Sequence, residues 1–378
     1  MRTGSVGNDW KAIRAEFPAL STCTYLNTAT FGQLARRTRA AIDRHFDHRD
    51  EVACADFLEW FNDADQVRGS VARLLHVEAD DVAFIPMAVQ AISLLIAGID
   101  WQPGDRIVTL ENEFPNQIYF PALLAERGVE LVVAPWERFY ESINSRTRLV
   151  ALSGLSYLNG FRAPAEEVGR FCRERNVLFY LDATQGCGAL EYDLSRIPVD
   201  VFAVHAYKWM LAPNGTGFMY VAPQVREWLK PTLVGWRSDR NWRNVDQLEA
   251  AAPKFAPAAE RYEGGMLAHS LIYGLGASVE MMLEIGPAAI EQRVMELAGR
   301  TRQMLESHGG EFLEGEHYRS PILAPKFPGR DASLLAQQLK QAGVLVSARY
   351  GRLRVSTHFY NDENDTDRLS EELKRLLQ

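Results

Sequence analysis

Short apolar runs alternate with stretches of helical spacing between about Arg68 and Val221. The runs have the length of strands, and the stretches between them repeat apolar residues every three or four positions. This alternation predicts βαβ units around a mostly parallel sheet, in which ligands bind beyond the carboxyl ends of the strands. The predicted strands are residues 82–85, 106–110, 130–134, 148–152, 177–181, 199–204 and 218–221. The predicted helices are residues 88–99, 116–128 and 165–175, with another helix ending over 70–75 and a short helix or turn over 142–147.

The pattern changes after Trp236. Residues 238–257 are polar, contain prolines and follow no clear period, which indicates a surface excursion. Long helices are predicted over 267–285 and 290–308, because Gly286-Pro287 between them is a stop and start signal. The tail alternates predicted strands (318–324, 344–347 and 353–356) with predicted helices (333–342 and 365–377). We therefore expect an α/β protein with a large domain over 25–250, a smaller α+β domain over 251–378, and an N-terminal segment, 1–24, packed on the smaller domain.

Composition narrows the range of partners. The 378-residue chain is 47% hydrophobic and 24% charged, as in ordinary soluble globular proteins, and carries a formal charge of −8. Nucleic acid is not an expected partner, and the basic run 36–39 is interpreted as a solvated helix face. No apolar stretch approaches the ~18 residues of a membrane helix, and the N-terminus has no signal-peptide core, so we expect a cytoplasmic protein. The four cysteines form no CxxC pair, and no metal site is expected.

Two strand ends carry a carboxylate and a lysine. Asp182 closes the apolar run 177–181, and Lys208 follows the run 199–204, 26 positions later (208 − 182). This pairing is what an enzyme that uses pyridoxal 5′-phosphate needs: the lysine amine forms a Schiff base, and the acid keeps the pyridinium nitrogen protonated. The pair therefore predicts such an enzyme, and Lys208 is its central residue.

Other residues near these strand ends are candidates for holding the cofactor. His205 and Tyr207 precede the lysine and could both donate to the phosphate. The helix that starts near Ala88 and Val89 would add backbone N–H groups and a favourable dipole. Phe114 follows the strand 106–110 and could stack on the pyridine ring. Taken alone, His205 would more often be a satisfied buried histidine and Phe114 an ordinary core or loop residue.

The segments Leu181-Asp182-Ala183-Thr184-Gln185-Gly186 and His205-Ala206-Tyr207-Lys208 resemble those of the class V aminotransferases. This group of fold-type-I pyridoxal-phosphate enzymes includes cysteine desulfurases, selenocysteine lyases, isopenicillin N epimerase and kynureninase. The resemblance runs from the segment 25–29, which contains Asn27, to the segment 353–356. It implies the fold-type-I architecture, with a large domain that binds the cofactor and a smaller C-terminal domain.

The resemblance also implies roles for individual residues. Lys208 would carry the cofactor and Asp182 would pair with the pyridinium nitrogen. Gln185, with Ser156, would approach the phenolic oxygen, and Phe114 would cover the ring. His205, Tyr207 and the backbone of Ala88 and Val89 would hold the phosphate. Arg354 would bind the substrate α-carboxylate, for which a planar fork is suited, and Asn27 is a further candidate for substrate binding.

Three departures from the family pattern limit what the resemblance implies. Val89 stands where relatives often have a threonine that binds phosphate, and Gly265-Met266 stands where a Gly-Thr usually reaches the neighbouring subunit's phosphate. The stretch 343–351 contains no cysteine, although desulfurases carry their catalytic cysteine there. Persulfide chemistry of the desulfurase kind is therefore not expected.

We expect a homodimeric enzyme, with its site near the subunit interface, that acts on a small amino-acid substrate. Class V aminotransferase activity is the first prediction. A carbon–sulfur lyase or an epimerase of the same family is the alternative, supported by similarity of Gly235-Trp236-Arg237-Ser238 and Thr357-His358-Phe359-Tyr360-Asn361 to that branch. A non-catalytic relative that binds a metabolite is a further alternative, which the intact lysine and aspartate disfavour.

Overall fold

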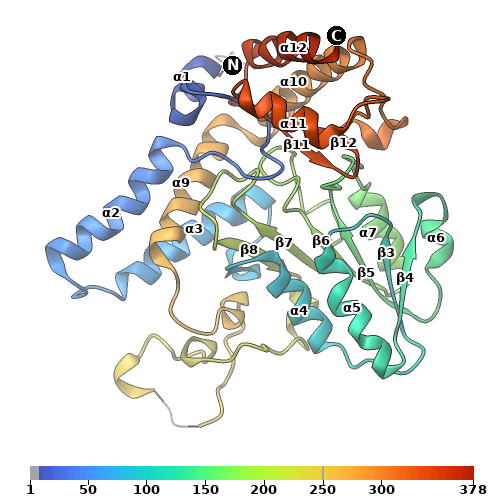
Figure 1. Ribbon diagram of the computed structural model, residues 1–378. Helices are drawn as coiled ribbons and strands as arrows, with labels where there is room; N and C mark the ends of the chain where they lie inside the picture. The colour runs from blue at the N-terminus through green and yellow to red at the C-terminus, as the bar shows by residue number, and fades with distance from the viewer. Residues whose placement is uncertain (1–7, 249–250) are drawn as a thin grey trace, which may run out of the picture.

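A seven-stranded sheet lies at the centre of the protein (Figure 1), in a computed structural model that describes residues 8–248 and 251–378. The strand order is β2-β8-β7-β6-β5-β3-β4. All pairs between β7 and β4 are parallel, whereas β8 is antiparallel to both of its neighbours. The predicted α/β fold with a mostly parallel sheet is therefore confirmed. The strands are β2 (Val82–Ile85), β3 (Arg106–Leu110), β4 (Glu130–Ala134), β5 (Thr147–Ser153), β6 (Leu178–Asp182), β7 (Val201–His205) and β8 (Gly217–Val221).

Both faces of this sheet are buried. Successive side chains of a strand point to opposite faces, so Leu149 and Ala151 of β5 join one apolar core, and Val150 and Leu152 join the other. Burial on both faces explains why the strands read as continuous apolar runs rather than as alternating ones. The helices that accompany the sheet are α3 (Glu59–Leu75), α4 (Ala88–Gly98), α5 (Tyr119–Leu123), α6 (Phe139–Ser142), α7 (Ala165–Glu174) and α8 (Pro223–Arg226).

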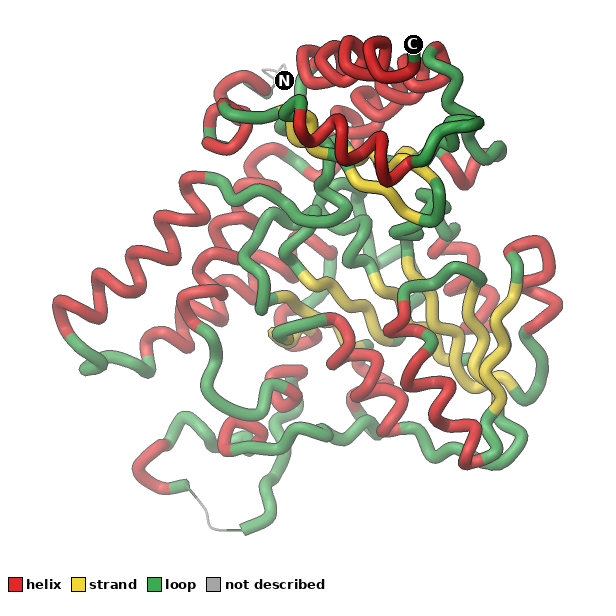
Figure 2. Tube along the Cα trace, viewed as in Figure 1, coloured by secondary structure: helices red, strands yellow, loops and turns green. Residues whose placement is uncertain are grey.

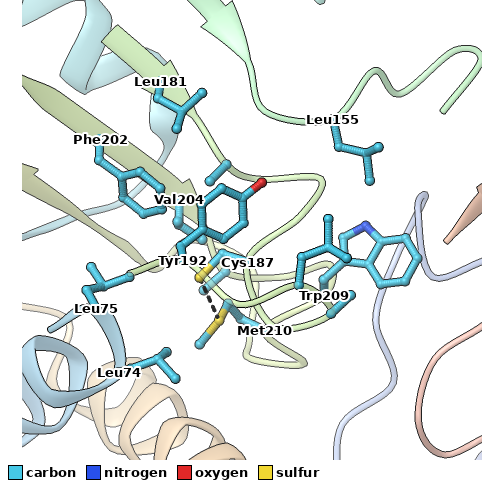
Figure 3. Packing of buried hydrophobic residues seen from close by; sticks show 14 of the residues in the cluster. Leu74, Leu75, Leu155, Leu181, Cys187, Tyr192, Phe202, Val204, Trp209 and Met210 are labelled. Carbon is cyan, nitrogen blue, oxygen red and sulfur yellow. Dashed lines mark hydrogen bonds between the residues drawn. The ribbon is translucent and has the colours of Figure 1, made fainter. Parts of the chain in front are cut away.

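One of the two cores contains a cysteine that the sequence places near the cofactor site. Figure 3 shows Cys187 beside Met210, with Sγ and Sδ 3.6 Å apart, among side chains that include Leu74, Leu75 and Tyr192. Cys187 is buried, and burial raises the pKa of its thiol to about 12. A thiol that stays protonated at neutral pH is a poor nucleophile, so Cys187 serves packing.

Helix α9 (His269–Ile285) packs against α2 (Arg36–Val52) and α3. Small residues allow the close approach, because a side chain at Gly276 would meet Val67 and one at Gly274 would meet Ile42. The predicted break before α10 (Pro287–Ser307) is confirmed at Gly286, whose φ is 93°. Between β8 and α9 the described residues form loops and short helical turns, as expected for the surface excursion (Figure 2). The division into domains at residue 251 stays a prediction.

The C-terminal part forms a smaller layer above the edge of the main sheet (Figure 1). Strands β11 (Ser347–Arg349), β12 (Arg352–Ser356) and β9 (Ile322–Leu323) form an antiparallel sheet. The N-terminal strand β1 (Thr24–Tyr25) pairs with β10 (Val344–Leu345). Helix α1 (Trp10–Ala15) joins this layer through Arg14, whose Nη1 lies 2.7 Å from Asp365 Oδ2. Helices α11 (Ala332–Gln341) and α12 (Glu363–Leu377) complete it.

Two predicted elements are shorter than expected. The predicted helix over 116–128 is divided into 3-10 turns at Pro115–Gln117 and Leu124–Arg127 around the short α5. Pro121, in the first turn of α5, lacks an N–H and cannot donate to the preceding turn, so the helix does not extend back to residue 116 with unbroken hydrogen bonds. The predicted strand over 318–324 is reduced to β9, and Pro321 lies directly before it.

Candidate cofactor and substrate site

Three neighbouring strands end on polar side chains that face one cavity. Ser153 ends β5, Asp182 ends β6 and His205 ends β7, and Ser153 lies opposite Asp182 in the strand register. A cavity of about 250 Å³ opens at this edge. Its walls consist of Met87, Ala88, Val89, Phe114, Asn116, Ser153, Tyr157, Asp182, Thr184, Gln185, His205, Tyr207 and Lys208. The parallel order of β5, β6 and β7 thus brings together most of the residues that the sequence singled out.

Lys208 lies in the wall of this cavity with only 7% of its surface exposed. Its Nζ is 5.7 Å from the ring centre of Phe114 and 5.4 Å from that of Tyr207. Burial lowers the pKa of Lys208 to about 8, although the charge of Asp182 raises it, and the charges of Arg354 and Arg349 lower it further. A substantial fraction of this amine is therefore neutral near pH 7–8, which a nucleophilic amine requires.

Asp182 is held by two donors. Its Oδ1 accepts the N–H of Thr184 at 2.9 Å, and its Oδ2 accepts Gln117 Nε2 at 3.2 Å. Neither donor is cationic, and no Lys, Arg or His forms an ion pair with Asp182 among residues 8–248 and 251–378. The buried carboxylate therefore keeps its negative charge available for a cationic group inside the cavity.

Another part of the cavity wall favours an anion. It is formed by His205, Tyr207 and the start of α4. Burial, and then the charge of Lys208, lower the pKa of His205 to about 4, so its ring is neutral at pH 7. The ring stands 4.4 Å from that of Tyr207, and its buried Nε2 has no hydrogen-bond partner in the described part of the chain. Ala88 and Val89 line the cavity at the first turn of α4, where backbone N–H groups and the helix dipole favour an anion.

The remaining candidates around the ring position differ in their placement. Phe114 lines the cavity and packs edge-on against Tyr157, with ring centres 5.3 Å apart. Gln185 also lines it, and its amide donates to the carbonyl of Ala29 and accepts from the indole N–H of Trp209. Ser156 lies outside the cavity wall, and its hydroxyl accepts the N–H of Leu158. The serine that faces the cavity is Ser153, and the role given to Ser156 stays a prediction.

A half-buried glutamate behind the cavity was missed by the sequence analysis. Glu113 accepts the N–H of Ser153 at 2.7 Å and its hydroxyl at 2.6 Å. Burial raises the pKa of Glu113 to about 7, although the hydrogen bonds from Ser153 lower it. No local motif distinguishes Glu113, but its position after β3 puts it at the same sheet edge as Asp182. The sequence rule about strand ends could have selected it.

Arg354 is buried beside the cavity without an acidic partner. Its Nη1 donates to the carbonyl of Tyr157 at 2.7 Å, Nη2 to Thr30 Oγ1 at 2.5 Å, and Nε to Ser347 Oγ at 3.0 Å. No carboxylate pairs with it in the described residues, and burial, then Arg349, lower its pKa to about 10. Asn27 does not line the cavity, but its Oδ1 accepts Thr30 Oγ1 at 2.8 Å. Asn27 is thus placed to orient Thr30, and through it Arg354.

The other departures from the family pattern are visible in the structure. Met266 is 60% exposed, after Gly264 and Gly265. The stretch where desulfurases carry a catalytic cysteine forms β11 and the turn at Tyr350 and Gly351.

In the part of the chain that is described, no helix is long and apolar enough to span a bilayer. Nor do three His, Cys, Asp or Glu side chains gather there as metal ligands would.

These residues fit pyridoxal phosphate. The pyridinium nitrogen requires a carboxylate, which Asp182 offers, and the phosphate requires donors, which α4 and the unpartnered His205 Nε2 offer. The aldehyde carbon requires an amine with a lowered pKa, and Lys208 lies in the same wall. Each of the three recognised parts of the cofactor therefore has a matching group.

Known proteins resemble the chain over nearly its whole length. Isopenicillin N epimerase of Streptomyces clavuligerus is 28% identical and is matched over 97% of this chain and 98% of its own. A probable cysteine desulfurase of Methanothermobacter thermautotrophicus is 24% identical, over 96% and 97%. Among solved structures, a complex of the cystine C–S lyase C-DES with its product cysteine persulfide has a TM-score of 0.86 at 22% identity, covering 94% of this chain and 98% of that one.

The fold of that solved structure is thus the fold of this chain. At 22% identity the likeness concerns the fold alone. The similarity of sequence is more informative, because the family model described as Aminotransferase class-V matches residues 58–369. The resemblance inferred from the segments around Asp182 and Lys208 is confirmed. The chain belongs to the class-V aminotransferase family and is a pyridoxal-phosphate enzyme.

Proposed function

We propose that the protein is an aminotransferase that acts on α-amino acids. The observation that carries this proposal is the placement of Lys208 as a single proton carrier in the cavity. Its pKa of about 8 lies nearest neutrality among the wall residues with shifted values, because His205 has a pKa of about 4 and burial raises the pKa of Tyr157 and Tyr207. One base that moves a proton between two carbons on the same face is what transamination needs.

The chain's own residues divide the remaining work. The cofactor, when bound, supplies a ring that accepts electrons from the substrate Cα. Asp182 would hold a negative charge for the ring nitrogen, and Lys208 would accept the Cα proton and could deliver it to a neighbouring carbon. Arg354, whose charge is unpaired in the described residues, binds the α-carboxylate and fixes the orientation of the Cα–H bond. Phe114 and Tyr157 line the cavity and give it an aromatic wall.

A second candidate function is a carbon–sulfur lyase or an epimerase. Two of the similar proteins support it, isopenicillin N epimerase of Streptomyces clavuligerus and the solved cystine C–S lyase. Elimination uses the same lysine for proton removal. Epimerisation needs a second acid on the other face, and the phenol of Tyr157, whose ring packs against Phe114, is a candidate in the cavity wall.

One experiment separates these reactions. The purified holoenzyme is incubated with a panel of amino acids, with and without an α-keto acid, and the products are identified. Amino-group exchange that depends on the keto acid supports the proposal. Pyruvate with ammonia or sulfide, or an inverted amino acid, replaces it with the second candidate. Lys208→Ala is the control: it should stay folded and lose both turnover and the borohydride-reducible adduct, and an adduct that persists contradicts the role of Lys208.

We further propose a homodimer. Large apolar side chains are exposed close to the cavity: Phe31 is 44% exposed and contacts Tyr207, and Met87 and Phe114 of the wall are 45% and 39% exposed. A second subunit that covers this surface would complete the site. Sedimentation equilibrium of the holoenzyme tests this, and a monomer at micromolar concentration contradicts it.

A further inference from the structure

A second arginine stands beside the proposed carboxylate site. Arg349 ends β11, two residues after Ser347, so both side chains leave the strand on the same face. Ser347 is paired with Arg354 across the β-ladder, and its hydroxyl accepts Arg354 Nε at 3.0 Å. The side chain of Arg349 therefore starts on the face of the hairpin that carries the guanidinium of Arg354.

Neither arginine has an acidic partner among residues 8–248 and 251–378. The hydrogen bond recorded for the Arg349 guanidinium goes to the carbonyl of the adjacent Ala348, at 2.7 Å. Arg349 is half-buried and Arg354 is buried, whereas two other buried arginines, Arg68 and Arg237, both pair with Glu263, at 2.7 and 2.8 Å. Two neighbouring cations that no carboxylate neutralises repel each other, and this repulsion contributes to the lowered pKa of Arg354.

Arg354 lies directly behind the part of the cavity wall that Tyr157 forms, and Arg349 lies beside Arg354 on the hairpin. Arg354 binds the carbonyl of Tyr157, and the ring of Tyr157 lines the cavity against Phe114. The charges of Arg349 and Arg354 both act on the phenol of Tyr157, and both act on the Lys208 amine. A substrate bound in the cavity beside Lys208 would therefore lie within the influence of both charges.

We propose that the amino acid bound here carries an acidic side chain, with its α-carboxylate on Arg354 and its second carboxylate on Arg349. This inference rests on the proposed function, because it places an amino acid at Lys208. Two carboxylates neutralise two cations, whereas a monocarboxylate leaves one unneutralised. The planar guanidinium of each arginine matches a carboxylate with paired hydrogen bonds.

The test compares acidic with neutral amino acids as substrates of the holoenzyme. The panel contains L-aspartate and L-glutamate, which have two carboxylates, and L-alanine and L-methionine, which have one. The wild type should prefer at least one acidic member, and Arg349→Met should reduce kcat/KM for it by about tenfold or more, with neutral members changed less than about twofold. Arg349→Glu should reverse the preference toward amino acids with a cationic side chain.

Arg352→Met is the matched control. Arg352 lies opposite Arg349 in the same hairpin, but its guanidinium donates to the carbonyl of Ala324 at 3.0 Å. This variant removes one charge from the hairpin and should leave the preference unchanged. If Arg349→Met lowers kcat/KM equally for acidic and neutral substrates, or changes the sedimentation of the enzyme, the inference is overturned while the proposed function stands. If no amino acid reacts and no adduct forms at Lys208, the proposed function itself fails.

Discussion

The backbone of Gly32 lies directly against that of Lys208. The N–H of Gly32 donates to the carbonyl of Tyr207, the residue before Lys208, at 2.9 Å. A methyl group on Gly32 would overlap the carbonyl oxygen of Lys208. The segment after β1 thus forms a wall behind the lysine, and only a residue without a side chain allows this approach.

Gly32→Ala should therefore displace the lysine segment. The clash is with backbone atoms, which cannot rotate away, so we expect a loss of stability of about 1–3 kcal/mol and weaker cofactor binding. Gly299→Ala, in α10, is the control, because nothing lies within 4 Å of the added methyl group and helix propensity should improve stability by about 0.5–1 kcal/mol. Urea unfolding and cofactor titration measure both effects. A Gly32→Ala enzyme with unchanged cofactor affinity would contradict the proposed wall.

Arg354→Gln should raise KM for α-amino acids by about 10- to 100-fold, because the variant loses a charge-assisted hydrogen bond to the carboxylate. Amines that lack a carboxylate should be unaffected. Arg354→Lys keeps the charge but not the planar fork, so its KM for α-amino acids should lie between those of the wild type and Arg354→Gln. Thr30→Val removes the acceptor of Arg354 Nη2 and should produce a smaller rise. Steady-state kinetics across these variants check the order, and equal KM values for wild type and Arg354→Gln would exclude Arg354 as the carboxylate site.

The cofactor end of the site could be predicted from sequence more completely than the substrate end. Asp182 ends one apolar run and Lys208 lies shortly after another, and the parallel order of the strands brings such positions to one edge. The contact between Arg354 and Thr30 joins residues 324 positions apart, and no local pattern indicates it. Glu113 and Ser153 likewise meet only after β3 and β5 pair. Local signals place strand ends, whereas side-chain partners depend on tertiary packing.

Asp182→Asn should slow proton removal from the substrate by about 100-fold or more, because a neutral amide cannot hold the ring nitrogen in its charged state. The charge of Asp182 also raises the pKa of Lys208, so the variant should shift that pKa below its present value of about 8. The pH dependence of Lys208 acylation in the apoprotein measures this shift. Gln117→Leu removes a hydrogen bond to Asp182 but keeps the charge, and should change the pKa much less. An unchanged pKa in Asp182→Asn would show that the two groups do not interact.

Glu113 should make the stability of the protein depend on pH. Burial raises its folded-state pKa from 4.5 to about 7, so between these values the folded state binds a proton that the unfolded state releases. This contribution is therefore greatest at the acidic end and is lost as the pH rises from about 4.5 to about 7, up to about 3 kcal/mol in total.

Glu113→Gln keeps an acceptor for the N–H of Ser153 and cannot ionise, so it should remove this contribution. Other groups also titrate in this range, and the useful quantity is the difference in unfolding free energy between wild type and Glu113→Gln at each pH. We expect this difference to move in favour of the variant as the pH rises from 5 to 7.5, in urea unfolding followed by circular dichroism. Parallel pH profiles for the two proteins would show that the Glu113 carboxyl has an ordinary pKa.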